Sequence, residues 1–227
     1  MKATSMSRIW RRMRLAVARL WHDRSGIAAT EFAVIVPVML VMFFGTVEIS
    51  SGVAVDRKVT LISRTLSDLV SQAPPAATNA PNAPVNDTYL QNVFTAGIAM
   101  MTPYCATPAS LQISEVYVAS NLVAKIQWSK AATVSSCAAT QATLANSTRN
   151  PGDVVTIPSQ LLVAQTYLIF SEVSYLYVPM GIGYVMKANL NLGDVAYARP
   201  RQVVCVVYTT PNPSQPAPVS GNPCPTP

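Results

Sequence analysis

Glu31 is the residue whose position first suggests chemistry. It directly precedes sixteen residues without a charge, Phe32 to Val47. An acidic side chain at membrane depth costs several kcal/mol unless it is near the interface, neutralised or paired. Cleavage after Gly26 would supply a partner, because Ile27 would become a new amino terminus with an ammonium that is mostly charged at neutral pH. We therefore predict a cut between Gly26 and Ile27, and pairing of Glu31 with that ammonium on an adjacent subunit.

The cysteines form a second reactive group, and all four follow the apolar run: Cys105, Cys137, Cys205 and Cys224. An even number outside the reducing cytosol favours two disulfides, which three pairings would allow. We predict local closure, Cys105 with Cys137 and Cys205 with Cys224. The first bond would close a loop that contributes roughly 3 to 4 kcal/mol. A zinc site is the alternative, but the sequence has no CxxC pair and no histidine after the apolar run.

Enzyme chemistry finds little support in the sequence. The only histidine is His22, so a chain cut after Gly26 would have no imidazole for a catalytic triad or a general base. The acids Glu115, Asp153, Glu172 and Asp194 are scattered, as solvated strand or turn residues usually are. No nucleophile elbow, phosphate-binding loop or dinucleotide fingerprint occurs. We expect a protein that is not an enzyme and that holds no cofactor or metal.

Composition indicates that water does not solvate the whole chain. Of 227 residues, 50% are hydrophobic and only 11% are charged, against roughly 25% in soluble domains. The net charge of +6 arises in residues 1–25, which carry seven basic side chains and one acid, while the rest of the chain has nine of each. A basic tract beside an apolar run is typical of the cytoplasmic flank of a membrane helix, and it argues against nucleic-acid binding.

The apolar run is long enough to span a bilayer. With the preceding Ile-Ala-Ala-Thr it approaches the roughly twenty residues that a spanning helix needs. Pro37 removes one backbone donor and should kink the helix. The alternative is a cleavable signal peptide with a small-residue site at Gly52 to Ala54, although Glu48 fits poorly between core and site.

Gly26 followed by IAATEF resembles the prepilin-peptidase site of Flp-type type IV pilins. The wider stretch DRSGIAATEFAVIVPVMLVMFFGTVEI is similar to the N-terminal segment of TadE-like and TadG-like pilus assembly proteins of the tight-adherence system. Fainter similarity continues through RKVTLISRTLSDLVSQ, MMTPY, IQWSKA and EVSYLYVP. Phe32 departs from the tyrosine of major Flp pilins, and the chain is far longer than those subunits. The resemblance therefore implies a pseudopilin or minor pilin.

The resemblance also implies where the protein works and with what. The partners would be a prepilin peptidase, other tight-adherence pilins and pseudopilins, the inner-membrane assembly platform and membrane lipid. Glu31 and Phe32 would serve subunit pairing. The chain would cross the bacterial inner membrane once, with its N-terminus in the cytoplasm and its C-terminal domain periplasmic or extracellular, and it could enter the pilus after processing. The alternatives are an uncleaved single-pass envelope protein with a binding domain and a secreted hydrolase.

The remaining chain predicts an α+β fold. A single N-terminal transmembrane helix would continue into an amphipathic helix, whose apolar stripe Val55, Val59, Ile62, Leu66 and Leu69 covers either the protein's own core or a seam between subunits. A small antiparallel sheet would follow, from segments rich in Val, Ile, Tyr and Thr: LQISEVYVAS, LVAKIQWSK, DVVTIP, AQTYLIFSEVSYLYVP and DVAYARPRQVVCVVYTT. The expected parts are a basic cytoplasmic leader (1–26), the helix (27–72), a Pro/Ala/Asn linker (73–87), an extracytoplasmic α+β domain (88–210) and a Pro-rich tail (211–227).

Overall fold

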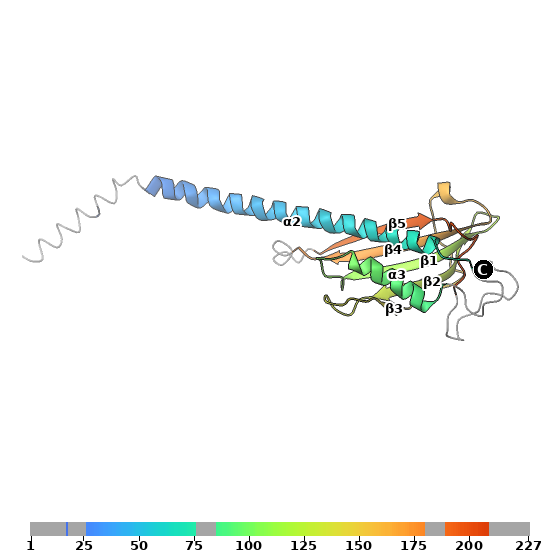
Figure 1. Cartoon of the computed structure of the whole chain (residues 1–227). Helices are drawn as coiled ribbons and strands as arrows, with labels where there is room; N and C mark the ends of the chain where they lie inside the picture. The colour runs from blue at the N-terminus through green and yellow to red at the C-terminus, as the bar shows by residue number, and fades with distance from the viewer. Residues whose placement is uncertain (1–16, 18–25, 76–84, 180–188, 209–227) are drawn as a thin grey trace, which may run out of the picture. The chain divides into compact units, whose positions relative to one another are not determined.

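The computed structural model describes residues 17, 26–75, 85–179 and 189–208 (Figure 1). Most of the leader, most of the linker and the whole Pro-rich tail lie outside the described residues. The chain divides into two compact units, residues 1–48 and 49–227. In the first unit the described residues are helical. The second unit contains the end of the same helix, a shorter helix and a sheet.

Helix α2 runs from Gly26 to Ser71 with Pro37 inside it. Its sequence explains the change in environment along its length. Residues 26–47 are almost all apolar and exposed, whereas from Val55 onward the apolar residues recur at spacings of four and three and are buried. Val55, Val59, Ile62 and Leu66 are completely buried in the domain core, so this stripe covers the protein's own core.

Helix α3, Asp87–Ala99, packs beside the buried part of α2. Its first turn is capped by the side chain of Asn86, which accepts a hydrogen bond from Tyr89 N at 2.9 Å. Beyond its last turn, Lys58 Nζ donates to the carbonyls of Met100 and Thr102, each at 2.7 Å, where a cation also complements the helix dipole. The helices approach closely at Gly97, where a Cβ atom would lie 3.1 Å from Leu66 Cδ2.

Five antiparallel strands form one sheet in the order β3-β2-β1-β4-β5. Their bounds are β1 Ala109–Val118, β2 Ala124–Thr133, β3 Thr143–Ala145, β4 Thr166–Tyr177 and β5 Leu190–Ala198. The predicted α+β class, with a long apolar helix followed by a small antiparallel sheet, is confirmed.

The two faces of the sheet have different covers. Leu111, Ile113, Ile169 and Val173 share a core with α2 and α3, which lie on that face in Figure 1. On the other face a smaller core includes Ile126, Leu168 and Phe170, covered by Val155 and Ile157. That cover reaches only part of the face.

Two strand predictions were wrong: one predicted strand does not form, and another has different ends. Residues 153–158 form no strand; a single bridge joins Val154 to Lys125, and Pro151 and Pro158 bracket the segment. The strand expected to start at Asp194 begins earlier, at Leu190, and ends at Ala198, directly before Arg199-Pro200. Proline lacks the N–H that a ladder needs, so residues 201–208 leave the sheet and return across the domain.

Candidate functional site

The predicted cleavage and pairing residues lie together in the first two turns of α2. Ile27 and Glu31 are four residues apart and therefore lie on one face of the helix. All four of Gly26, Ile27, Glu31 and Phe32 are exposed, Phe32 to 68%. A Cβ atom built on Gly26 would have no neighbour within 4 Å, so the backbone there is open to another protein.

Glu31 has no hydrogen bond or ion pair within the described part of the chain. Nearby polar groups are satisfied within the helix: Thr30 Oγ1 donates to the carbonyl of Ile27 at 2.8 Å. The backbone carbonyl of Ala33 loses its usual donor because Pro37 has no N–H. Among the described residues the carboxylate of Glu31 is thus left available for a partner.

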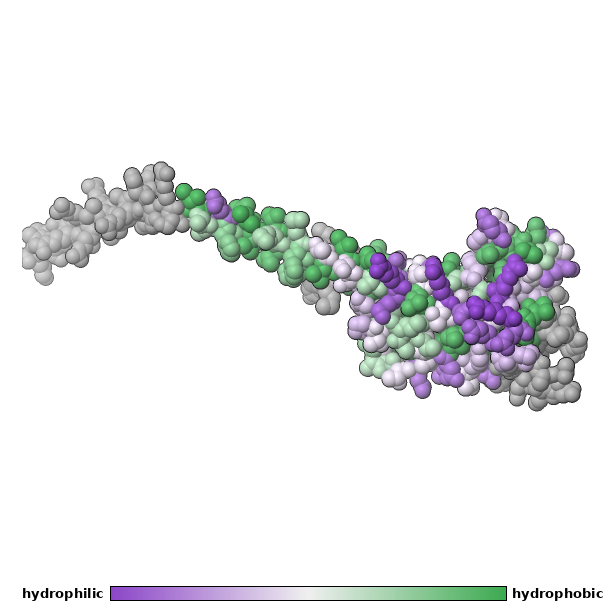
Figure 2. All heavy atoms as spheres, turned by 45° about the horizontal axis from the view of Figure 1, so that its top comes forward, coloured by the Kyte–Doolittle hydropathy of each residue, from purple (hydrophilic) through white to green (hydrophobic). Residues whose placement is uncertain are grey.

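The helix around these residues is apolar on all sides. Figure 2 shows hydrophobic residues along its surface. Their side chains are about half exposed or more, as at Val34 (69%), Val41 (68%) and Phe43 (62%). Among the described residues α2 is the one helix that is long and apolar enough to cross a membrane, judged by length and composition alone.

The structure joins Cys105 and Cys137 in a disulfide, the pairing predicted from the sequence. Beside it, Tyr175 Oη donates to the Cys105 carbonyl at 2.9 Å, which ties the loop after α3 to β4. Cys205 is also disulfide-bonded. Cys224 lies outside the described residues, so its pairing with Cys205 stays a prediction.

Glu115 corrects the expectation that the scattered acids are solvated. It is 3% exposed on β1, opposite Trp128 of β2. Its carboxylate accepts hydrogen bonds from Trp128 Nε1 at 3.0 Å and from Val206 N at 2.6 Å. Burial raises the pKa of Glu115 to about 8, and the two hydrogen bonds oppose that rise.

The C-terminal clasp, residues 201–208, is fixed to the domain through this carboxylate. Trp128 Nε1 also donates to the carbonyl of Val206 at 2.8 Å, and the ring of Tyr208 lies 5.4 Å from that of Trp128. Tyr208 Oη donates to Asp87 at the start of α3. Composition could not reveal this role for Glu115, because the clasp is about ninety residues away in sequence.

The described residues contain no group of three or more side chains arranged to hold a metal. Asp153 accepts a hydrogen bond from Asn150 N, and Glu172 pairs with Arg149. Each acid therefore has a local structural partner. His22 lies outside the described residues.

Comparison with known proteins gives one family and no individual relatives. No curated protein and no solved structure matches the chain. The family model that matches covers residues 26–65, from the predicted cleavage site through the apolar run and into the buried part of α2. Over this segment, which carries Gly26, Ile27, Glu31 and Phe32, the chain matches the family described as TadE-like protein, and the resemblance found in its sequence is confirmed.

Proposed function

We propose that this protein is a membrane-anchored pseudopilin or minor pilin that takes part in assembly of a tight-adherence pilus. The observation that carries the proposal is the division of α2. Its first half is apolar and exposed, whereas its second half is buried in the protein's own domain. The match to the TadE-like family covers the first half and continues into the second, to residue 65. An apolar surface that the chain leaves uncovered suits lipid and the helices of other pilins.

The work of the protein in this proposal is assembly rather than catalysis. The first half of α2 anchors the chain in the inner membrane and binds neighbouring pilins or pseudopilins, while the sheet domain stands on the periplasmic side. A prepilin peptidase cuts between Gly26 and Ile27, and the assembly platform receives the product. The excess of basic residues before Gly26 supports a cytoplasmic N-terminus.

The mature N-terminus tests cleavage. We expect the mass of protein extracted from membranes to correspond to a chain that starts at Ile27. Gly26→Val should leave the leader attached, because a side chain would obstruct the backbone at the cut. The matched control is Gly45→Val, since Gly45 also lies on α2 with no neighbour within 4 Å of a built Cβ atom.

Other N-termini would contradict the proposal. An intact leader in the parent would favour a permanently anchored envelope protein with a binding domain. A start near Val55 would mean removal of a signal peptide and a secreted protein. Protease added to intact spheroplasts should digest the sheet domain, and full protection of that domain would refute the orientation.

Glu31 has a separate role in the proposal, as the partner of the Ile27 ammonium on a neighbouring subunit. Glu31→Gln keeps size and polarity but removes the charge, so cleavage should continue while cross-linking to pilins decreases. Desolvation offsets much of the attraction in such a pair, so the decrease should be partial. Unchanged cross-linking at equal expression would reject the pairing, and failed cleavage would assign Glu31 to peptidase recognition.

A further inference from the structure

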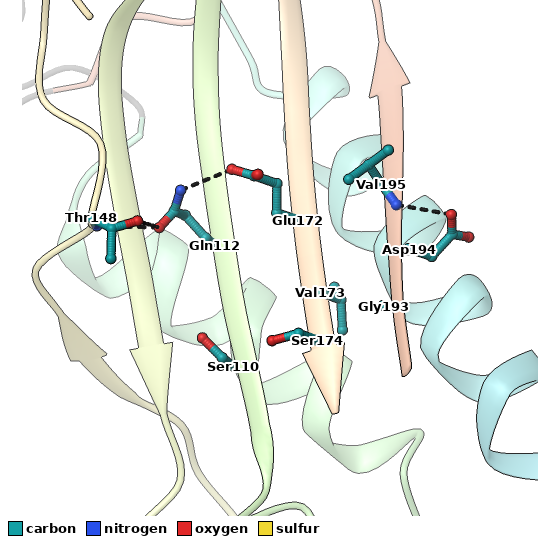
Figure 3. Close-up of a pocket in the computed structure, with 9 residues that line it drawn as sticks. All are labelled: Ser110, Gln112, Thr148, Glu172, Val173, Ser174, Gly193, Asp194 and Val195. Carbon is teal, nitrogen blue, oxygen red and sulfur yellow. Dashed lines mark hydrogen bonds between the residues drawn. The ribbon is translucent and has the colours of Figure 1, made fainter. Parts of the chain in front are cut away.

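The face of the sheet opposite the helices has a hollow that the assembly role does not use. It measures about 400 Å³ and is lined by residues of β1, β4 and β5 together with Thr148. Small-molecule sites typically have volumes of roughly 300 to 1,000 Å³. The hollow lies where the cover of Val155 and Ile157 does not reach, and Figure 3 shows the side chains that line it.

Small residues make its floor. Ser110, Ser174 and Gly193 lie directly opposite one another on β1, β4 and β5. Neither serine hydroxyl has a hydrogen bond within the described part of the chain. Because Gly193 has no side chain, the floor stays open there, and a built Cβ atom would meet nothing closer than Val173 O at 3.4 Å.

The next row of side chains forms a rigid polar wall. Arg149 holds Glu172 with two hydrogen bonds of 2.5 Å, one to each carboxylate oxygen. Gln112 Nε2 donates to Glu172 at 2.9 Å, and Gln112 Oε1 accepts from Thr148 Oγ1 at 3.0 Å. Gln112 is only 9% exposed, and the hydrogen bonds at both ends of its amide hold it in one orientation.

The charges of this wall largely cancel. The guanidinium of Arg149 neutralises Glu172 and also lies 5.2 Å from the ring centre of Phe170. Asp194 lies at the edge of the hollow, and in Figure 3 its carboxylate points away from the floor and accepts a hydrogen bond from Val195 N at 2.8 Å. The wall therefore offers a ligand little net charge, whereas hydroxyl groups would find both donors and acceptors.

We propose that the hollow binds a neutral saccharide unit. The hydroxyls of Ser110 and Ser174 donate to and accept from sugar hydroxyls, and the spare lone pair of Glu172 accepts another. Val195, 49% exposed at the side of the hollow, offers an apolar contact for the C–H face of the ring.

The test uses the full chain in detergent micelles and three neutral disaccharides, cellobiose, maltose and N,N′-diacetylchitobiose, observed by saturation-transfer NMR. We expect transfer to at least one of them. Gly193→Leu fills the floor without a backbone clash and should weaken binding at least tenfold. Ser174→Ala removes one hydroxyl and should weaken binding about fivefold. Thr143→Leu, which places the same leucine side chain at an exposed position of β3 outside the hollow, is the control and should bind as the parent does.

Three results would overturn the proposal. One is the absence of transfer to all three disaccharides. Another is equal binding by the parent and by Gly193→Leu, each shown to be folded by circular dichroism. The third is preference for glucuronic acid or for a triserine peptide over the neutral sugars. None of these results depends on cleavage at Gly26, so the assembly role and the saccharide site can fail independently.

Discussion

Replacing Glu115 with Gln tests whether a buried acid makes the sheet domain sensitive to pH. The native carboxyl has a pKa raised to about 8, against 4.5 for an unperturbed glutamic acid, because burial disfavours its charged form. Gln resembles the protonated acid, with one acceptor oxygen and a donor in the same place. The variant should therefore retain one of the bonds to Trp128 and Val206 but lose the titration.

The direction of the effect follows from proton binding. Between pH 4.5 and 8 the native acid holds its proton while the unfolded one has released it, so the free energy of unfolding falls as pH rises. Each pH unit in that interval changes the contribution of Glu115 by about 1.4 kcal/mol, which gives a total of about 4 to 5 kcal/mol. The stabilisation is fully present below pH 4.5 and is lost near pH 8.

The assay is urea denaturation of the full chain in micelles at several pH values. Trp10 and Trp21 are replaced by Phe in every protein, so that Trp128 alone reports unfolding. The difference in unfolding free energy between parent and Glu115→Gln should change by roughly 4 kcal/mol from pH 5 to pH 8. Asp56→Asn removes an exposed carboxylate from α2 and is the matched control. Parallel pH profiles for parent and Glu115→Gln would refute the reasoning.

Three further predictions concern stability and use the same denaturation assay. Phe94→Ala empties a completely buried position between α3 and the sheet and should cost about 3 to 5 kcal/mol; a loss below 1 kcal/mol would mean that the site collapses around the smaller residue. Replacing Cys105 and Cys137 together by Ser opens a loop with a sequence separation of 32 and should cost about 3 to 4 kcal/mol. The parent under reducing conditions should lose at least that much, because the disulfide of Cys205 opens as well. Arg201→Ala breaks an ion pair with Asp68 in which both side chains are substantially exposed, so we expect less than about 1 kcal/mol, and a larger loss would show that the pair anchors the clasp.

Local patterns were sufficient for the helices and the main strands. The spacing of Val55, Val59, Ile62 and Leu66 identified the buried face of α2, because helix periodicity is a property of neighbouring residues. It could not identify Ser63, which is completely buried beside the sheet and whose carbonyl accepts a hydrogen bond from Ser171 Oγ at 2.5 Å. That contact depends on how closely helix and sheet approach, which no single segment encodes.

The candidate functional residues also fall into two groups, those that local spacing predicts and those that only the fold brings together. Gly26 and Glu31 stay predictions as site residues; they could be proposed from the sequence because they are neighbours along one helix, and they lie in the segment that the TadE-like family model matches. Glu115 was misjudged because its donors come from a neighbouring strand and from the clasp. The wall of the hollow was missed for the same reason, since Glu172 meets Gln112 only through strand register and Arg149 only through the loop before Pro151.

The hydrogen bond from Val195 N to the Asp194 carboxylate affects how readily a strand of another molecule can pair with β5. Among the described strands, β5 is at one end of the sheet and pairs only with β4, and a terminal strand is where a foreign strand can add. In β5 the N–H of Val195 already donates to the Asp194 carboxylate. An incoming strand would have to displace that carboxylate and would leave its negative charge beside the newly paired strands. In the proposed assembly, where helices bring the molecules together, this occupied amide would disfavour pairing of β5 with a strand of a neighbouring sheet.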